Sequence, residues 1–199
     1  MKKTKQIKFW MIILTMSIWG SSSIMSETNF GMKAGLTTSK FTGESTLENA
    51  DSMGATMGIF GKQSIMNGVS IIGELNLTQR GGTQHQEVDG SKYSATYNLN
   101  YVELPILLSV NVTNRLGVYA GGYAAKLLDA GLKFPGYPSN DVTDMFNFNK
   151  DDYGTIIGIS YDIDSSFSFD LRLTQGQESL TPDFKMSNQS FSFSANKSF

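Results

Sequence analysis

The stretch SFSFDLRLTQ, residues 166–175, alternates polar and apolar side chains from Ser166 to Thr174. In an extended chain, successive side chains point to opposite faces, so this period of two predicts a β-strand rather than a helix. One face is apolar and the other carries charge. The apolar face holds Phe167, Phe169, Leu171 and Leu173, and the polar face holds Ser166, Ser168, Asp170 and Arg172.

The same alternation recurs through most of the chain, and helical periodicity is convincing nowhere. Eight segments of this kind can be marked, each bounded by turn-forming residues. Their length of about ten residues is what a tilted strand needs to cross a membrane. The expected strands are residues 29–41, 53–62, 69–80, 95–112, 116–128, 152–163, 167–175 and 189–199.

The connections between these segments alternate in length. QSIMNG (63–68), TNR (113–115) and DSS (164–166) are short, whereas the polar stretches 42–52, 81–94, 129–150 and 176–188 are long. Tight periplasmic turns and long extracellular loops are typical of bacterial outer-membrane barrels. The pattern predicts an all-β fold: an eight-stranded antiparallel up-and-down transmembrane β-barrel with both termini on the periplasmic side.

Alternation alone fits an apolar face turned to lipid or to a core. Aromatic residues eight positions apart, Tyr153 with Tyr161 and Phe191 with Phe199, favour lipid. Eight tilted residues span about 20 Å, which is near the spacing of the two aromatic girdles of a membrane barrel. A soluble secreted lipocalin-like barrel with an apolar interior remains the alternative.

If the polar faces line the interior, the barrel is only wide enough to be filled by side chains, and buried charges must pair. We expect Arg172 to reach Glu74 and Glu103 across the interior. A rigid network of ion pairs is the favoured interpretation, and a proton or ion path is the alternative. Pro105 lacks an N–H, so we expect a bulge or kink at residues 104–105. Further members of the expected charge cluster are Lys33, Arg80 and Asp170.

The first residues have the layout of a secretory signal peptide. Four lysines precede an eleven-residue apolar run, 9–19, which is too short to span a bilayer as a helix. We expect a signal peptide at residues 1–26 and one barrel domain at 27–199. Removing four lysines from 16 basic residues leaves 12 against 18 acidic ones, a formal charge of −6, which argues against nucleic acid as a partner. The chain has no cysteine for disulfides.

No catalytic motif is present, so we expect neither an enzyme nor a cofactor or metal site. The single histidine, His85, lies in the polar stretch 81–94. A lone loop histidine is more often a surface residue than a catalytic base. Two alternatives remain open: a lipid-modifying enzyme that uses His85, and a passive pore for small solutes.

Several segments together resemble the Bacteroidetes outer-membrane β-barrel proteins, the PorT-like group. NFGMKAGLTTSKFTG (29–43) is similar to the family's first strand, and GELNLTQRGG (73–82) is similar to its third. LNYVELPILLSVNV (99–112) is the closest match and keeps the family's Tyr101, Glu103 and Pro105. In the seventh strand, Asp170 and Arg172 match, but Leu173 stands where the family has Tyr.

The resemblance implies an eight-stranded barrel in the outer membrane, and its PorT-type members act in protein export. We expect a barrel with a side-chain-plugged interior that has a structural or interaction role or assists protein secretion. The last strand, NQSFSFSANKSF (188–199), is similar to the signal that the barrel assembly machinery of the outer membrane recognises. The expected partners are therefore outer-membrane lipid, this assembly machinery, and a secretion-system or surface partner. The aromatic residues of the expected assembly signal are Phe191, Phe193 and Phe199.

Overall fold

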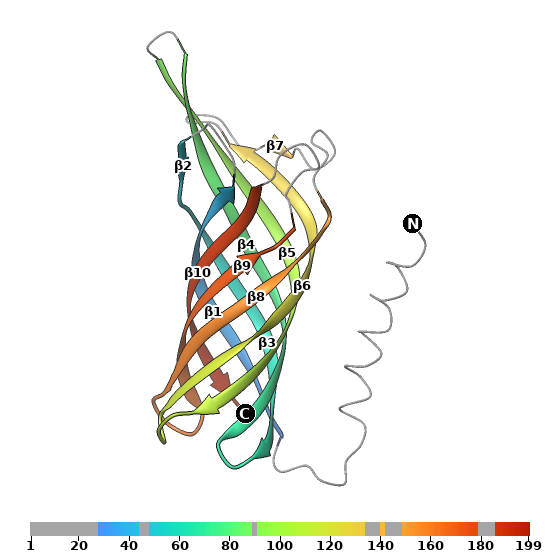
Figure 1. Cartoon of the computed structure of the whole chain (residues 1–199), viewed down its shortest axis with the longest axis vertical. Coiled ribbons are helices and arrows are strands. Elements are labelled where there is room, and N and C mark those ends of the chain that lie inside the picture. Colours follow the sequence, from blue (N-terminus) through green and yellow to red (C-terminus); the bar gives the residue numbers. More distant parts are fainter. Residues whose placement is uncertain (1–27, 44–47, 89–90, 134–139, 142–148, 179–185) are drawn as a thin grey trace, which may run out of the picture.

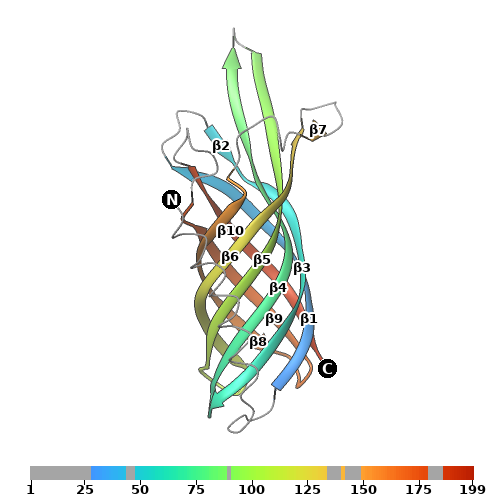
Figure 2. The ribbon, with the colours of Figure 1, turned by 90° about the vertical axis from the view of Figure 1, so that its right-hand side faces the viewer.

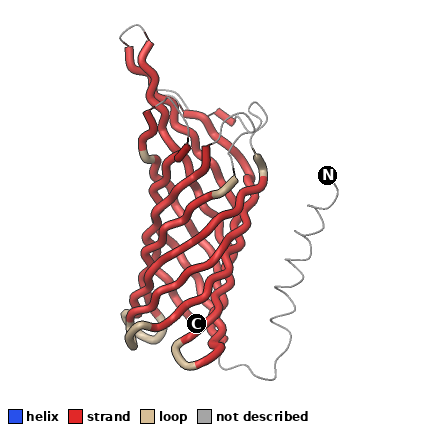
Figure 3. The backbone as a smooth tube through the Cα atoms, in the orientation of Figure 1, coloured by secondary structure: helices blue, strands red, loops and turns tan. Residues whose placement is uncertain are grey.

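Strands make up almost all of the described part of the chain (Figure 3). The computed structural model describes residues 28–43, 48–88, 91–133, 140–141, 149–178 and 186–199. The expected signal peptide therefore lies outside the described residues. Eight long strands are present: β1 (Thr28–Gly43), β3 (Ser52–Met66), β4 (Val69–Val88), β5 (Ser91–Asn111), β6 (Leu116–Lys133), β8 (Asp151–Asp162), β9 (Phe167–Gly176) and β10 (Met186–Ser198). Among the described residues, no helix is long and apolar enough to cross a membrane.

The eight long strands close into an antiparallel barrel, which confirms the expected fold class (Figures 1 and 2). Each pairs with its neighbour along the chain, and β1 pairs with β10 to complete the ring. The short turns after β3, β5 and β8 lie at the same end as the start of β1 and the C-terminus (Figure 1). We call this end the turn side and the opposite end the hairpin side. Gly68 has a φ of 76°, which suits the tight turn between β3 and β4.

The strand register can be followed once around the barrel. A row of directly paired residues that starts at Asp152 in β8 returns to β8 at Asp162, ten residues further along. A stagger of ten over eight strands corresponds to a strand tilt of about 40° and a backbone radius of about 8 Å. The residues of this row are Asp152, Ala125, Glu103, Asn76, Gly58, Lys33, Asn196, Ser168 and Asp162.

The two faces of the wall carry opposite chemistry, as the alternation predicts. Large apolar side chains on the outside are between 38% and 75% exposed, among them Leu36, Ile59, Leu108 and Ile157. The buried residues are mostly polar or charged, except for an apolar layer contributed largely by inward side chains of β5 and β6. A soluble protein shows the reverse arrangement. The alternative of a lipocalin-like barrel with an apolar interior is therefore wrong.

Four expected loops are shorter than their polar sequences suggested. The stretch 81–94 is not a loop, because β4 and β5 continue as a paired hairpin to Val88 and Ser91, beyond the rest of the barrel (Figure 2). The strand β6 likewise continues to Lys133, and β1 and β10 each include residues assigned to loops. Two short strands pair with these extensions: β2 (Glu48–Ala50) with β4, and β7 (Asn140–Asp141) with β6.

Pro105 causes no shift of register, so the expected bulge is absent there. Gly73 pairs with Ile106 and Asn76 with Glu103, so the register between β4 and β5 is the same on both sides of Pro105. The pairing is only interrupted there, because proline has no N–H to donate. The register shift of β5 lies instead between Asn100 and Tyr101, where its ladder with β6 skips Leu128 of β6.

Candidate functional site

The charged side chains inside the barrel form two ion-pair clusters. Each belongs to a strand whose period-two alternation turns it inward, so the barrel wall itself positions them. We call the first, Lys33, Glu74, Asp170 and Arg172, the turn-side cluster. We call the second, Arg80, Glu103 and Asp152, the hairpin-side cluster.

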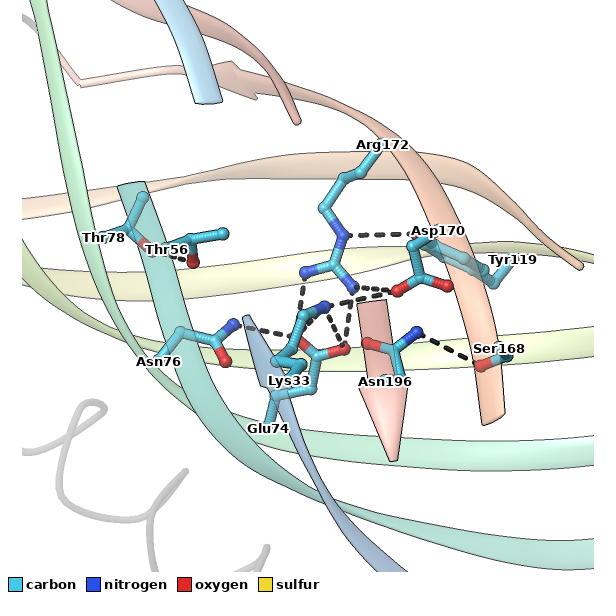
Figure 4. A network of polar contacts seen from close by, with 10 residues as sticks. All are labelled: Lys33, Thr56, Glu74, Asn76, Thr78, Tyr119, Ser168, Asp170, Arg172 and Asn196. Carbon is cyan, nitrogen blue, oxygen red and sulfur yellow. Dashed lines mark hydrogen bonds and ion pairs between the residues drawn. The ribbon is translucent and has the colours of Figure 1, made fainter. Parts of the chain in front are cut away.

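Glu74 is the centre of the turn-side cluster (Figure 4). Arg172 Nη1 donates to Glu74 Oε2 at 2.8 Å, and Arg172 Nη2 donates to Oε1 at 2.7 Å. Lys33 Nζ lies 3.4 Å from Glu74 Oε1 and 3.3 Å from Asp170 Oδ2. Asn76 Nδ2 donates a further hydrogen bond to Glu74 Oε2 at 2.8 Å. The cluster has two cations and two carboxylates, so its formal charge is zero.

The hairpin-side cluster is organised around Arg80. Arg80 forms ion pairs with Glu103 and, at 3.2 Å, with Asp152 Oδ2. Tyr123 Oη donates to the same Asp152 oxygen at 2.8 Å and accepts a hydrogen bond from Arg80 Nη1 at 3.1 Å. The Arg80 guanidinium also lies 4.7 Å from the ring centre of Tyr123 and 5.7 Å from that of Tyr101. Cations attract the faces of aromatic rings, so both tyrosines help to hold Arg80.

Glycines leave space for the two tyrosines of the interior. A Cβ atom on Gly158 would lie 2.4 Å from Cζ of Tyr119, and one on Gly154 would lie 2.8 Å from Cε1 of Tyr123. No side chain larger than hydrogen fits at either position while the ring stays where it is. The hydroxyl of Tyr119 accepts a hydrogen bond from Arg172 Nε at 3.3 Å. The glycines of β8 thus allow the tyrosines of β6 to reach both arginines.

The structure brings all six sequence-predicted charges into the interior but divides them between two clusters. Arg172 pairs with Glu74 as expected, whereas Glu103 pairs with Arg80 instead of Arg172. Sequence reasoning missed Asp152 and the tyrosines 119 and 123. Strand alternation could have identified Asp152, because its neighbour Tyr153 was correctly placed on the outside.

The residues of the proposed family motif lie together on the inner face of β5. Tyr101 is 1% exposed and packs against Arg80, which also pairs with Glu103, while Pro105 is fully buried. The aromatic residues of the last strand lie on the outer face, as expected. Phe191, Phe193 and Phe199 are all exposed there, and Phe193 stacks on Phe169 with ring centres 5.3 Å apart. His85 lies in the hairpin, where its backbone pairs with Ser94 and Glu48.

A cavity of about 150 Å³ opens at the turn side. Glu74, Asp170 and Arg172 of the turn-side cluster are among its lining residues. Its walls also carry Lys62, Asp162 and several serines. Within the described ranges, no group of three or more histidine, cysteine or acidic side chains is arranged to hold a metal ion.

Comparisons with known proteins identify the fold. The model of a family described as "Outer membrane protein beta-barrel domain" matches residues 20–181. No curated protein matches the chain. Among solved structures, Neisserial surface protein A is similar with a TM-score of 0.59 and 11% identity, over 87% of this chain and 100% of that one. Ail, the attachment invasion locus protein of Yersinia pestis, has a TM-score of 0.53 and 13% identity over the same shares of the two chains. At these identities the likeness shows the fold alone.

Proposed function

This chain belongs to the outer membrane protein beta-barrel domain family, and we propose that it is a closed barrel that anchors a binding surface. It is a small eight-stranded barrel protein of the outer membrane. In the proposal, the interior passes neither solutes nor ions. The turn side faces the periplasm, and the hairpin side faces the cell exterior.

One observation supports the proposal that the interior of the barrel is closed. Arg172 and Glu74 lie on opposite strands of the ring, and their ion pair joins the two sides of the barrel. The backbone radius of about 8 Å leaves little room around such a pair once the neighbouring side chains are added. The turn-side cavity reaches this cluster, and the hairpin-side cluster and the apolar layer of β5 and β6 fill other parts of the interior.

A swelling assay with proteoliposomes tests the closed interior. Liposomes that contain the folded protein should swell in solutions of arabinose or of potassium chloride no faster than protein-free liposomes. A known general porin at equal protein mass serves as the positive control. Rapid swelling with the wild-type protein would instead support the alternative of a passive pore.

The β4–β5 hairpin supports a binding role. Its strands pair as far as Val88 and Ser91, whereas the ladder of β5 with β6 ends at Thr96. The hairpin therefore extends beyond the wall that holds it, and β2 adds a third strand at Thr83–His85. Strands that extend beyond the sheet that holds them are suited to recognise a partner through backbone hydrogen bonds.

We propose that the partner is a surface ligand or a protein of a secretion system, as the PorT-like resemblance suggests, and that the role is not enzymatic. Cross-linking in native outer membrane followed by purification of the intact barrel would identify it. A variant that lacks residues 86–93 should lose the cross-linked partner while the barrel still folds. Retention of every partner by this variant would show that the hairpin is not the binding surface.

We also propose that residues 1–26 are a signal peptide and that the barrel assembly machinery recognises the last strand. Phe199 is 75% exposed on the outer face, and its N–H donates to the carbonyl of Phe30 across the seam between β1 and β10. A Phe199→Ala variant should yield less assembled barrel in the outer membrane than wild type. Equal assembly would argue against Phe199 as part of the recognition signal.

A further inference from the structure

We propose that the turn-side cavity binds a small organic cation, an ammonium or a guanidinium group. This ligand site is separate from the hairpin, and it does not depend on whether the interior conducts ions. Four properties of the cavity support the site: its shape, its charge, an unused buried acceptor, and its aromatic walls.

The cavity is built on three neighbouring strands. Asp162 in β8, Ser168 in β9 and Asn196 in β10 are directly paired in one row, and all three line it. The turn between β8 and β9 lies at the cavity too, through Asp164, Ser165 and Ser166. Backbone N–H groups of Ser166 and Phe167 donate to Asp164 Oδ1 at 2.7 and 2.9 Å, which holds this turn in place.

The charge of the cavity is negative. Arg172 and Lys33 are already paired with Glu74 and Asp170, so the turn-side cluster adds no net charge. The remaining charged lining residues are Lys62, Asp162 and Asp164. One cation and two carboxylates leave a formal charge of −1, which attracts a cation and repels an anion.

A buried acceptor without a donor marks a position for the ligand. Asn196 is 7% exposed, and its Nδ2 donates to Ser168 Oγ at 3.2 Å. Its Oδ1 has no hydrogen-bond partner among the described residues. Because an unpaired buried acceptor is unfavourable, a small rotation of the Asn196 side chain toward an N–H donor in the cavity would gain a hydrogen bond for Oδ1.

The walls suit an organic cation better than a metal ion. Phe60, Tyr119 and Phe167 line the cavity, and aromatic faces attract ammonium and guanidinium groups. In the described part of the chain, no set of three ligating side chains is arranged for a metal. The cation can be a free small amine, or the side chain of a lysine or arginine in a periplasmic protein segment.

Titration followed by NMR tests the site on the folded, full-length barrel in detergent micelles. Agmatine is the probe for free amines, and the acetylated, amidated tripeptide Gly-Arg-Gly is the probe for a side chain. Gly-citrulline-Gly, capped in the same way, is the uncharged control. Saturable shifts of the backbone amides of Ser168 and Asn196 with either charged probe, and none with the citrulline peptide, are the expected result.

Three variants locate the binding. Asp162→Asn should weaken binding about tenfold, because the ligand loses a carboxylate partner. Asp51→Asn makes the same change in charge at an exposed site between β2 and β3 and should leave binding unchanged. Lys62→Gln removes the competing cation and should strengthen binding. The heat-dependent mobility of each variant on gels shows that its barrel is folded.

The outcomes distinguish a free amine from a protein side chain as the ligand, and both from the absence of a cation site. Binding of agmatine supports a free amine, and binding of the peptide alone supports a protein side chain. Absence of saturable shifts with both charged probes up to 10 mM would overturn the proposal, as would equal effects of the substitutions at residues 51 and 162.

Discussion

Glu74 on β4 and Arg172 on β9 lie four strands apart in either direction around the barrel, yet they form a bidentate ion pair of 2.7 and 2.8 Å. The strands therefore face each other, and the pair crosses the interior. Because Lys33 and Asp170 join the same pair, the charges compensate one another in a place that is nearly closed to water.

Replacing Glu74 by alanine should strongly destabilise the barrel. The substitution leaves Arg172 and Lys33 buried near a single carboxylate, and an uncompensated buried charge costs about 3–5 kcal/mol. Urea unfolding in lipid vesicles measures the change. Replacing Glu74 and Arg172 together by methionine should cost much less, since no unpaired charge results. A double variant as unstable as the single one would contradict this explanation.

Gly158→Ala should destabilise the barrel by about 1–3 kcal/mol, because the new methyl group collides with the Tyr119 ring and the carbonyl of Leu171. The shifted ring also loses its hydrogen bond from Arg172. Gly122→Ala is the matched control, since the nearest atom to a Cβ there is the carbonyl oxygen of Gly154 at 3.4 Å. Equal losses in the folded fraction on gels would show that Tyr119 is not the cause.

Ile157→Lys tests which part of the outer face contacts the hydrocarbon of the bilayer. Ile157 is exposed near the middle of β8, and a lysine at the bilayer midplane costs about 2–4 kcal/mol. Val112→Lys, next to the turn after β5, should cost about 0–1 kcal/mol because its ammonium reaches water. Unfolding in vesicles measures both. Equal effects would mean that the two positions lie at the same depth.

Asp164 should titrate at lower pH than an ordinary aspartate. Backbone N–H groups of Ser166 and Phe167 donate to its carboxylate, which lowers the pKa of Asp164. Since the folded-state pKa is below the unfolded one, the stability that this turn gains is present above the ordinary pKa of about 3.9 and is lost as the pH falls below it. A ¹³C titration of the side-chain carboxyl checks the sign. A midpoint at or above the ordinary value would contradict the turn geometry.

Alternation predicted the faces of the strands, but it could not predict their stagger. Both Glu74 and Glu103 point inward by parity, and they lie on neighbouring strands opposite Arg172. Which of the two glutamates Arg172 reaches depends on the stagger that the strand pairings accumulate around the barrel. That stagger, ten residues per circuit, is the sum of the offsets of all eight strand pairings and is not encoded in any single segment.

The hairpin was missed for a related reason. Residues 81–94 lack the alternation of apolar and polar side chains that marked the other strands. A strand needs this pattern only where one face contacts lipid and the other the interior. Beyond the wall of the barrel both faces of a hairpin can meet water, so a polar sequence forms strands without a periodic signal.

Single-channel recording in planar lipid bilayers tests the central claim most directly. The wild-type barrel should insert without conductance steps in 1 M potassium chloride, because the ion pair of Glu74 and Arg172 and its neighbours close the interior. A folded variant with alanine at both positions should show small, discrete steps. Steady conductance through the wild-type barrel, unchanged in the double variant, would contradict the account.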